Sequence, residues 1–310
     1  MHSTRREFIR NTTLATTGML LSASLPLWAN EEKQTLTLLH TNDVHSRLDP
    51  FPMDGGKFQG LGGVIARDRL IQKIRKESAQ VLLLDAGDMF QGTPYFNYFK
   101  GEPEITVMNL MGYDAGTLGN HDFDNGIDGL VKQLRHAEFP IVNCNYDFSQ
   151  TALEHKILPY TIKKKGDLKI GIFGVGILLQ GLVPDALCEG VTYKDPIECA
   201  NEMAYYLKKN KRCDYVVCLS HLGFEYKDNK VSDKVLAKET DYVDCIIGGH
   251  THTFLDEVHK TKNRKNQEVI VNQVGWAGIN LGRINIFFSH NTSPNYASDL
   301  SSIKIDESEI

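Results

Sequence analysis

Short apolar runs alternate along the chain with longer stretches in which apolar residues recur at helical spacing. The short runs have strand length and lie at 35–40, 81–85, 141–143, 169–175, 215–220 and 244–247. The longer stretches predict helices at 63–76, 104–111, 126–137, 196–208 and 231–240. This alternation predicts an α/β fold with layered sheet and helices, in which the helices cover a largely buried sheet.

Two further segments predict hairpins with basic turns. Residues 157–175 form the first, and its turn contains Lys163, Lys164 and Lys165, which we expect in solvent. The second joins predicted strands at 253–259 and 268–274 through a turn at 260–265. No linker divides residues 34–290, which we interpret as one domain, and the mostly polar residues 291–310 predict a tail without regular structure.

The charge of the chain narrows the range of functions. With 34 basic and 39 acidic residues the formal net charge is −5, and neither sign forms a long block. Nucleic-acid binding through a basic surface is therefore not supported. The six cysteines form no CxxC pair, so we expect buried free thiols, although an oxidising compartment leaves a disulfide open.

The first residues predict an export signal instead of a part of the fold. Arg5 and Arg6 precede a modestly apolar stretch at 14–28 and Ala29, a small residue suited to cleavage. This pattern is similar to a twin-arginine signal peptide, so we expect residues 1–29 to be removed and the mature protein to lie in the periplasm. A membrane anchor is the alternative, but the stretch is interrupted by polar residues and falls short of a full span.

Polar residues follow the predicted strands at the points where those strands end. In open α/β sheets the carboxyl ends of strands gather at one edge, so distant residues converge there. Neighbouring glycines allow the tight turns that such convergence needs. The residues are Asp43 and His45 after 35–40, Asp88 after 81–85, His221 after 215–220, and His250 and His252 after 244–247.

These residue types indicate metal ions. Carboxylate, imidazole and amide oxygen without cysteine suit divalent manganese, iron, cobalt or zinc. With Asn120 the candidates number seven, too many for one ion. Two ions that share one carboxylate would receive four protein ligands each, and such a pair can activate a water and neutralise a phosphoryl oxygen.

Five sequence blocks, in order, resemble the calcineurin-like metallophosphoesterases, and the branch they resemble most is the catalytic domain of bacterial periplasmic 5′-nucleotidases. Each block alone is weak, whereas the ordered set, which spans about residues 35–290, is specific. The blocks read His40-Thr41-Asn42-Asp43-Val44-His45, Gly87-Asp88-Met89-Phe90-Gln91, Gly119-Asn120-His121-Asp122-Phe123-Asp124, Ser220-His221 and Gly249-His250-Thr251-His252.

The resemblance implies a role for each residue. Asp43, His45, Asp88 and His252 would hold one ion, and Asp88, Asn120, His221 and His250 the other, with Asp88 as the bridge. His121 and Asp124 would form the catalytic pair, and Asn120 and His121 would also contact the substrate. Asp122 stands where the family often has Glu, a departure outside that pair, and His40 is interpreted as structural.

The implied activity is hydrolysis of a phosphate ester by a metal-bound hydroxide, with nucleoside 5′-monophosphates or related nucleotides as substrates. The alternatives are a broader phosphomonoesterase, a phosphodiesterase acting on nucleotide sugars or cyclic nucleotides, and a binding module that holds a phosphorylated ligand without turnover. Tyr95, Phe96, Tyr98 and Phe99 could stack on a base, but we predict that they pack in the core.

Full-length relatives in this branch continue into a C-terminal domain that supplies arginines for the phosphate and aromatic residues for the base. The sequence ends before the corresponding point. A site without that domain is open to water, which leaves two alternatives. Either the chain is a permissive phosphoesterase with high Michaelis constants, or a separate protein with a domain of that type completes substrate recognition, and we favour the second.

Overall fold

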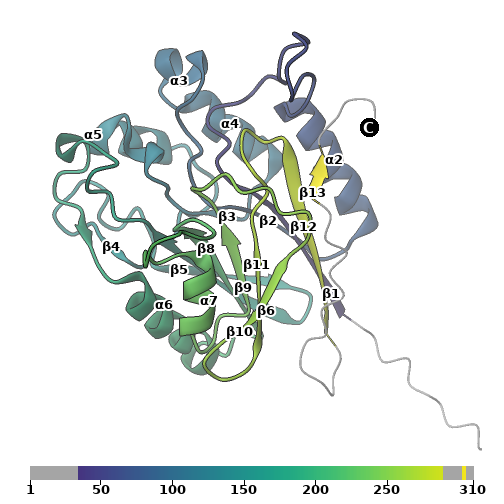
Figure 1. Ribbon diagram of the computed structural model, residues 1–310, viewed down its shortest axis with the longest axis vertical. Helices are drawn as coiled ribbons and strands as arrows, with labels where there is room; N and C mark the ends of the chain where they lie inside the picture. The colour runs from purple at the N-terminus through teal and green to yellow at the C-terminus, as the bar shows by residue number, and fades with distance from the viewer. Residues whose placement is uncertain (1–33, 289–301, 305–310) are drawn as a thin grey trace, which may run out of the picture.

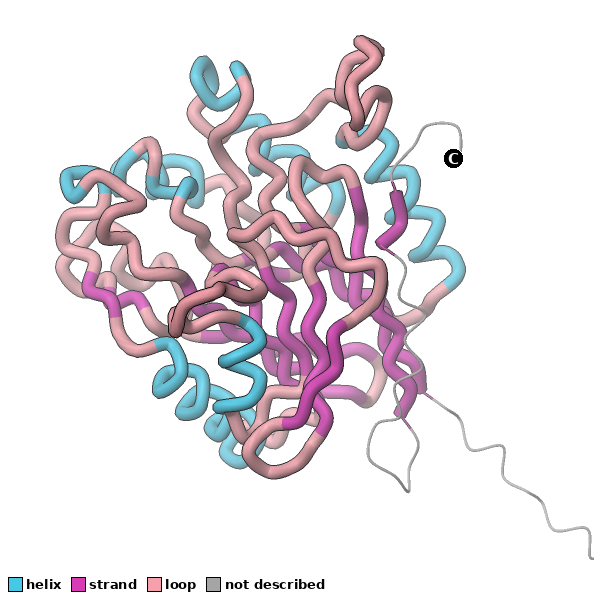
Figure 2. Tube along the Cα trace, viewed as in Figure 1, coloured by secondary structure: helices cyan, strands magenta, loops and turns pink. Residues whose placement is uncertain are grey.

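A computed structural model of the chain describes residues 34–288 and 302–304, and it contains two sheets that pack face to face (Figures 1 and 2). The first has five strands, in the order β13 (Ser302–Lys304), β12 (Asn280–Phe288), β1 (Gln34–Thr41), β2 (Val81–Asp85) and β3 (Ala115–Gly116). The second has six, in the order β10 (His259–Lys262), β11 (Glu268–Asn272), β9 (Cys245–Gly248), β8 (Tyr215–His221), β6 (Leu168–Gly176) and β5 (Tyr160–Lys165). A small third sheet pairs β4 (Tyr146–Asp147) with β7 (Thr192–Tyr193).

The central strands of both sheets are parallel. β1, β2 and β3 run in one direction within the first sheet, and β6, β8, β9 and β11 are parallel within the second. In the first sheet, the antiparallel strands β12 and β13 lie at one edge. In the second sheet, the antiparallel strands β10 and β5 form the two edges. Parallel strands place all their carboxyl ends at one edge, which is where the polar loops lie.

The space between the sheets is filled by apolar side chains from alternate strand positions. Leu36 and Leu38 of β1 pack in one cluster with Ile170 and Ile172 of β6, and all four are fully buried. Because the opposite faces lie under helices, both faces of these strands are largely buried, as predicted.

Helices cover the outer faces of the two sheets (Figure 1). α2 (Val64–Glu77), α4 (Glu102–Met111) and α5 (Gly126–Leu134) pack on the five-stranded sheet, and α6 (Pro196–Tyr205) and α7 (Asp233–Glu239) pack on the six-stranded sheet. The shorter helices are α3 (Pro94–Phe99), the 3-10 helices η1 (His121–Phe123) and η2 (Asp185–Leu187), and the π-helix η3 (Tyr206–Asn210). The layered α/β fold is therefore confirmed, with two sheets at its centre.

Some predicted strands were wrong in detail. Residues 141–143 form only isolated bridges, because the side chain of Asn143 accepts the N–H groups of Asn145 and Tyr146 and turns the chain. The predicted strand at 253–259 is absent apart from its last residue and a bridge at Phe254, and the second hairpin turns at 263–267, where Asn263 accepts two backbone N–H groups. The sequence patterns also missed β12, which pairs with β1 from Gly282 to Phe288.

The lysines of the first hairpin lie in β5 itself, and not in its turn. Lys163, Lys164 and Lys165 pair with β6, and Gly166, with φ of 58°, makes the turn with Asp167. β5 is an edge strand, where lysines discourage pairing with another chain. Within the predicted polar tail, Ser302–Lys304 form strand β13. β13 pairs with the backbone groups that β12 would otherwise leave unpaired at the edge of the sheet.

The prediction that the four aromatic residues pack in the core was half wrong. Phe96 is buried and stacks on Phe90. Tyr98 and Phe99 are 80% and 53% exposed, because the short surface helix α3 can turn only one face inward. All six cysteines are free thiols, as predicted, but only Cys213, Cys218 and Cys245 are buried.

The predicted signal peptide at 1–29 lies outside the described residues. Among the residues that the structure describes, no helix combines the length and the apolar character needed to cross a membrane.

Candidate metal centre

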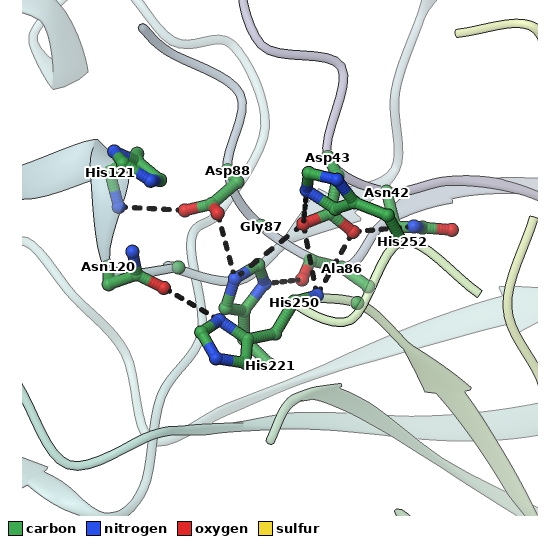
Figure 3. A network of polar contacts seen from close by, with 12 residues as sticks. Asn42, Asp43, Ala86, Gly87, Asp88, Asn120, His121, His221, His250 and His252 are labelled. Atoms are coloured by element: carbon green, nitrogen blue, oxygen red, sulfur yellow. Dashed lines mark hydrogen bonds and ion pairs between the residues drawn. The ribbon is translucent and has the colours of Figure 1, made fainter. Parts of the chain in front are cut away.

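Loops at the carboxyl ends of the parallel strands bring the predicted ligand residues together (Figure 3). The loops of both sheets contribute, so side chains more than two hundred residues apart are neighbours. Asp43 and His45 follow β1, Asp88 follows β2, Asn120 follows β3, His221 ends β8, and His250 and His252 follow β9.

Asp43, His45 and His252 form one ligand group, whose donor atoms all lie within 4.8 Å of one another. The Nε2 atoms of His45 and His252 are 3.0 Å apart, and His252 Nε2 is 3.4 Å from Asp43 Oδ1. The Asp43 carboxylate is fully buried and accepts the backbone N–H of His250. Three donor atoms thus converge as the ligands of a metal ion do.

Asp88, His221 and His250 form a second group with the same spacing. His221 Nε2 is 3.1 Å from Asp88 Oδ2. Asn120 joins this group, because its Oδ1 is 2.9 Å from His250 Nδ1. The four residues include every member of the second predicted ligand set.

Asp88 lies between the two groups (Figure 3). Its Oδ2 atom, 3.1 Å from His221 in the second group, is also 3.8 Å from His45 Nε2 in the first. Its Oδ1 atom accepts the backbone N–H of His121 at 2.8 Å. A carboxylate that faces both groups has the placement that a bridging ligand requires.

Hydrogen bonds fix the orientation of two ligand imidazoles. His221 Nδ1 donates to the carbonyl oxygen of Ala86 at 2.7 Å, and His45 Nδ1 to that of Gln91 at 3.1 Å. In each ring the Nε2 atom is then directed into the centre. His221 Nε2 is buried and its printed polar contact is the ion pair with Asp88, so a metal ion could take the place of its proton and the donor set fits divalent ions.

The pKa values of the imidazoles reflect burial and the neighbouring carboxylates. Burial lowers the pKa of His45, and it lowers the pKa of His250 to about 4, so both rings are neutral near pH 7. Burial also lowers the pKa of His221, but the Asp88 carboxylate outweighs it and raises that pKa to about 10. The proton that this pair shares is the one a metal ion would displace.

Most of the predicted ligands have left-handed backbone conformations, which disfavour residues other than glycine. The φ angles are 50° for Asp43, 51° for His45, 56° for Asp88, 72° for His250 and 51° for His252. Such conformations persist only where surrounding structure enforces them, and they concentrate at functional sites. Gly119 is needed here, because a Cβ atom on it would lie 2.2 Å from Asp88 Oδ1.

The predicted catalytic pair lies at the open side of the centre. His121 Nδ1 is 2.8 Å from Asp124 Oδ2, and the His121 side chain is 37% exposed. Both belong to the turn of η1, which also carries Asn120 at its start. His121 is therefore beside the ligand groups and accessible to a substrate.

Asp122 has a role that the sequence analysis missed. Its buried carboxylate accepts four backbone N–H groups at 2.8 to 3.2 Å, from Asp88, Met89, Phe90 and Gly119. It thereby ties the loop that carries Asp88 to the loop that carries Asn120. The only signal in the sequence was an acidic residue between His121 and Asp124 in the third block.

We expect Asp122→Asn to destabilise the fold by about 2 kcal/mol, because the new NH₂ group would face N–H donors that lose their acceptor. Denaturant unfolding of the metal-free protein measures this change. Asp256→Asn, at an exposed aspartate, is the matched control and should leave the unfolding midpoint unchanged. Equal midpoints for both variants would show that the four hydrogen bonds contribute nothing to stability.

Trp276 is a second residue that the sequence analysis missed. Its ring stacks on His252 with centroids 5.7 Å apart and an interplanar angle of 8°. Phe51 and Phe58 pack against the edges of the tryptophan. This aromatic cluster thus packs against the His252 ring. His40, by contrast, lies between the sheets, bonded to Asn272, which agrees with its structural interpretation.

Comparison with known proteins places these features in a family. The family model described as calcineurin-like phosphoesterase matches residues 36–254. The 5′-nucleotidase of Rattus norvegicus is 38% identical over 246 residues, which cover 76% of this chain and 41% of that protein. The chain thus spans about two fifths of that relative's length.

Solved structures give the same result. A 5′-nucleotidase precursor from Thermus thermophilus superposes with a TM-score of 0.78 and 31% identity, over 87% of this chain and 54% of that one. The NAD nucleotidase of Haemophilus influenzae superposes with a TM-score of 0.74 and 28% identity, over 86% and 49%. With its ordered motifs, its two ligand groups and these matches, the chain belongs to the calcineurin-like phosphoesterase family.

Proposed function

We propose that the chain is a two-metal phosphoesterase that hydrolyses nucleoside 5′-monophosphates or related nucleotides. The observation that carries this proposal is the Asp88 carboxylate, which faces both ligand groups. Two divalent ions held there would activate a water molecule and neutralise charge on the phosphoryl oxygens. One ion would be held by Asp43, His45, Asp88 and His252, and the other by Asp88, Asn120, His221 and His250.

His121 is proposed to act on the leaving group. Because its Nδ1 atom faces the Asp124 carboxylate at 2.8 Å, the proton on that nitrogen is fixed and Nε2 is available to the substrate. The imidazole can then stabilise or protonate the departing oxygen, while Asp124 stabilises the charged ring. The carboxamide of Asn120, at the start of the same turn, would also contact the phosphate.

The substrate class is supported by the relatives, which include proteins named 5′-nucleotidase with more than a third of aligned residues identical. The negative formal charge of the chain does not oppose it, because the metal ions would supply positive charge where the phosphate binds. We further propose export through the twin-arginine route to the periplasm, which is supported by Arg5, Arg6 and the apolar stretch that follows.

Phosphate release from AMP by the purified chain with Mn²⁺ tests the function. We expect release that saturates with metal, stops when a chelator is added and returns when Mn²⁺ is restored, with two ions bound per chain. Hydrolysis of p-nitrophenyl phosphate without hydrolysis of AMP would indicate a broader phosphomonoesterase. Tight binding of AMP without release in the presence of metal would instead indicate a binding module.

A further inference from the structure

His252 differs from two other candidate ligands, His45 and His221, in how its ring is restrained. The His252 side chain is 39% exposed, whereas those of His45 and His221 are 9% and 0% exposed. His45 and His221 each face a backbone carbonyl oxygen through Nδ1. In the part of the chain that the structure describes, the polar contacts of the His252 ring involve only Nε2, which faces His45 and Asp43. The orientation of this ring therefore depends on packing.

Trp276 supplies that packing. Its ring is parallel to the His252 ring within 8°, and the ring centroids are 5.7 Å apart, which is within the range of offset-stacked pairs. Stacking restricts rotation of the imidazole and leaves Nε2 facing Asp43 Oδ1, 3.4 Å away. An imidazole that binds a divalent cation becomes more positive, and the face of an indole attracts positive charge. The stack therefore favours the ring in the state in which it acts as a ligand.

The backbone on either side of Trp276 is tied to the two loops that carry this ligand group. The N–H of Ala277 donates to the carbonyl oxygen of Asp43 at 2.7 Å, and the N–H of Gly275 donates to that of Thr253 at 2.9 Å. Ala277 has a left-handed conformation with φ of 57°, which persists only where surrounding structure enforces it. The indole thus has a defined place relative to both loops.

Aromatic neighbours restrain the indole further. Phe51 and Phe58, from the loop after β1, meet the Trp276 ring at interplanar angles of 77° and 83°. Phe58 also stacks on Phe254, with centroids 6.1 Å apart and an interplanar angle of 17°. Phe254 follows His252 by two residues, so the cluster contacts the loop of this ligand at two points.

We propose that Trp276 is a positioning residue for the ion of the ligand group that contains Asp43 and His252, which we call the first ion. Its indole holds the His252 imidazole in the orientation in which Nε2 can bind that ion. Stacking thus does for His252 what a carbonyl acceptor does for His45 and His221. The inference rests on the ligand sets of the proposed function, but not on ester hydrolysis, because metal binding alone measures it.

Mn²⁺ binding to the full-length chain, measured by calorimetry, tests the inference. We expect Trp276→Leu to weaken binding of the first ion about tenfold and to leave the affinity for the second ion unchanged, which also shows that the variant is folded. Trp276→Phe keeps an aromatic face and should restore most of the affinity. Tyr242→Leu is the control, because Tyr242 is a half-buried aromatic residue that packs on Tyr205, and it should change neither affinity.

The two ions are told apart with Asn120→Ala, which removes a ligand of the second ion only. A double-mutant cycle then separates positioning from general support of the loops. If Trp276 acts through His252, Trp276→Leu should have no further effect on Mn²⁺ binding once His252→Ala is present.

Equal weakening by Trp276→Leu with and without His252, or equal weakening of both ions, would show support of the fold and overturn the inference. Unchanged Mn²⁺ affinity in Trp276→Leu would overturn it as well and leave the phosphoesterase function standing. The expected effect on the first ion, in a chain that binds two ions and hydrolyses no ester, would support the inference and contradict only the proposed function.

Discussion

Asp88→Ala is expected to lower phosphoesterase activity on the order of a thousandfold and to reduce the metal content of both ligand groups at once. The reason is geometric, since one Asp88 oxygen lies 3.1 Å from His221 in one group and 3.8 Å from His45 in the other. Removing this carboxylate takes a ligand from each ion and leaves the charge of two neighbouring ions less well compensated. Elemental analysis of the purified variant, beside its rate on AMP, measures both effects.

Two further variants make this test specific. Asp88→Asn keeps the size of the side chain and tolerates the left-handed backbone, so a loss of metal in this variant reports the missing charge and not strain. Asn120→Ala removes a ligand from one group only and should lower the metal content less than Asp88→Ala does. Loss of a single ion with near-normal turnover in Asp88→Ala would contradict the bridging role.

The convergence of the candidate ligands could be predicted because their positions have a fixed relation to the strands. Asp43, Asp88 and His250 each follow a buried strand within three residues, and parallel strands bring such positions to a common edge. No knowledge of the distances was needed for that step. β2, which is apolar on both faces, was even predicted with its observed bounds.

Other features could not be predicted because they depend on partners far away in the sequence. β12 is defined by its pairing with β1 across about 240 residues, and its own mixed pattern gives no clear period. Trp276 acquires a role only because the chain returns it to the face of His252. Likewise the exposure of Tyr98 depends on which face of α3 meets the core, and six residues carry too few apolar positions to indicate it.

The backbone conformations of the candidate metal centre could not be predicted from the local sequence either. Left-handed conformations at Asp43, His45 and His252 are unfavourable for these residue types, so local propensity would not predict them. They are enforced by hydrogen bonds between loops, such as those from the backbone N–H groups of Asp43 and His45 to the carbonyl oxygens of Gly87 and Asp88. The candidate ligands are thus placed by the packing of loops on a rigid sheet edge.

His121→Ala is expected to leave both ions bound and to slow turnover of AMP about a hundredfold. The imidazole contacts the Asp124 carboxylate and is partly exposed, and only the backbone N–H of His121 contacts Asp88. Alanine keeps that N–H, so the ligand groups should remain intact. The lost side chain is the one proposed to stabilise the leaving oxygen, and its removal should lower kcat much more than it raises KM.

The dependence on the leaving group distinguishes this role from a merely structural one. An ester with a good leaving group, such as p-nitrophenyl phosphate, needs little help at its departing oxygen, whereas the ribose oxygen of AMP needs much more. His121→Ala should therefore slow AMP hydrolysis severely and p-nitrophenyl phosphate hydrolysis far less. His155→Ala, which removes an imidazole that is 90% exposed and remote in sequence from every motif, serves as the control and should alter neither rate. Equal slowing of both esters by His121→Ala, or an empty metal position in that variant, would show that His121 acts as a ligand or as a support for the centre and not at the leaving group.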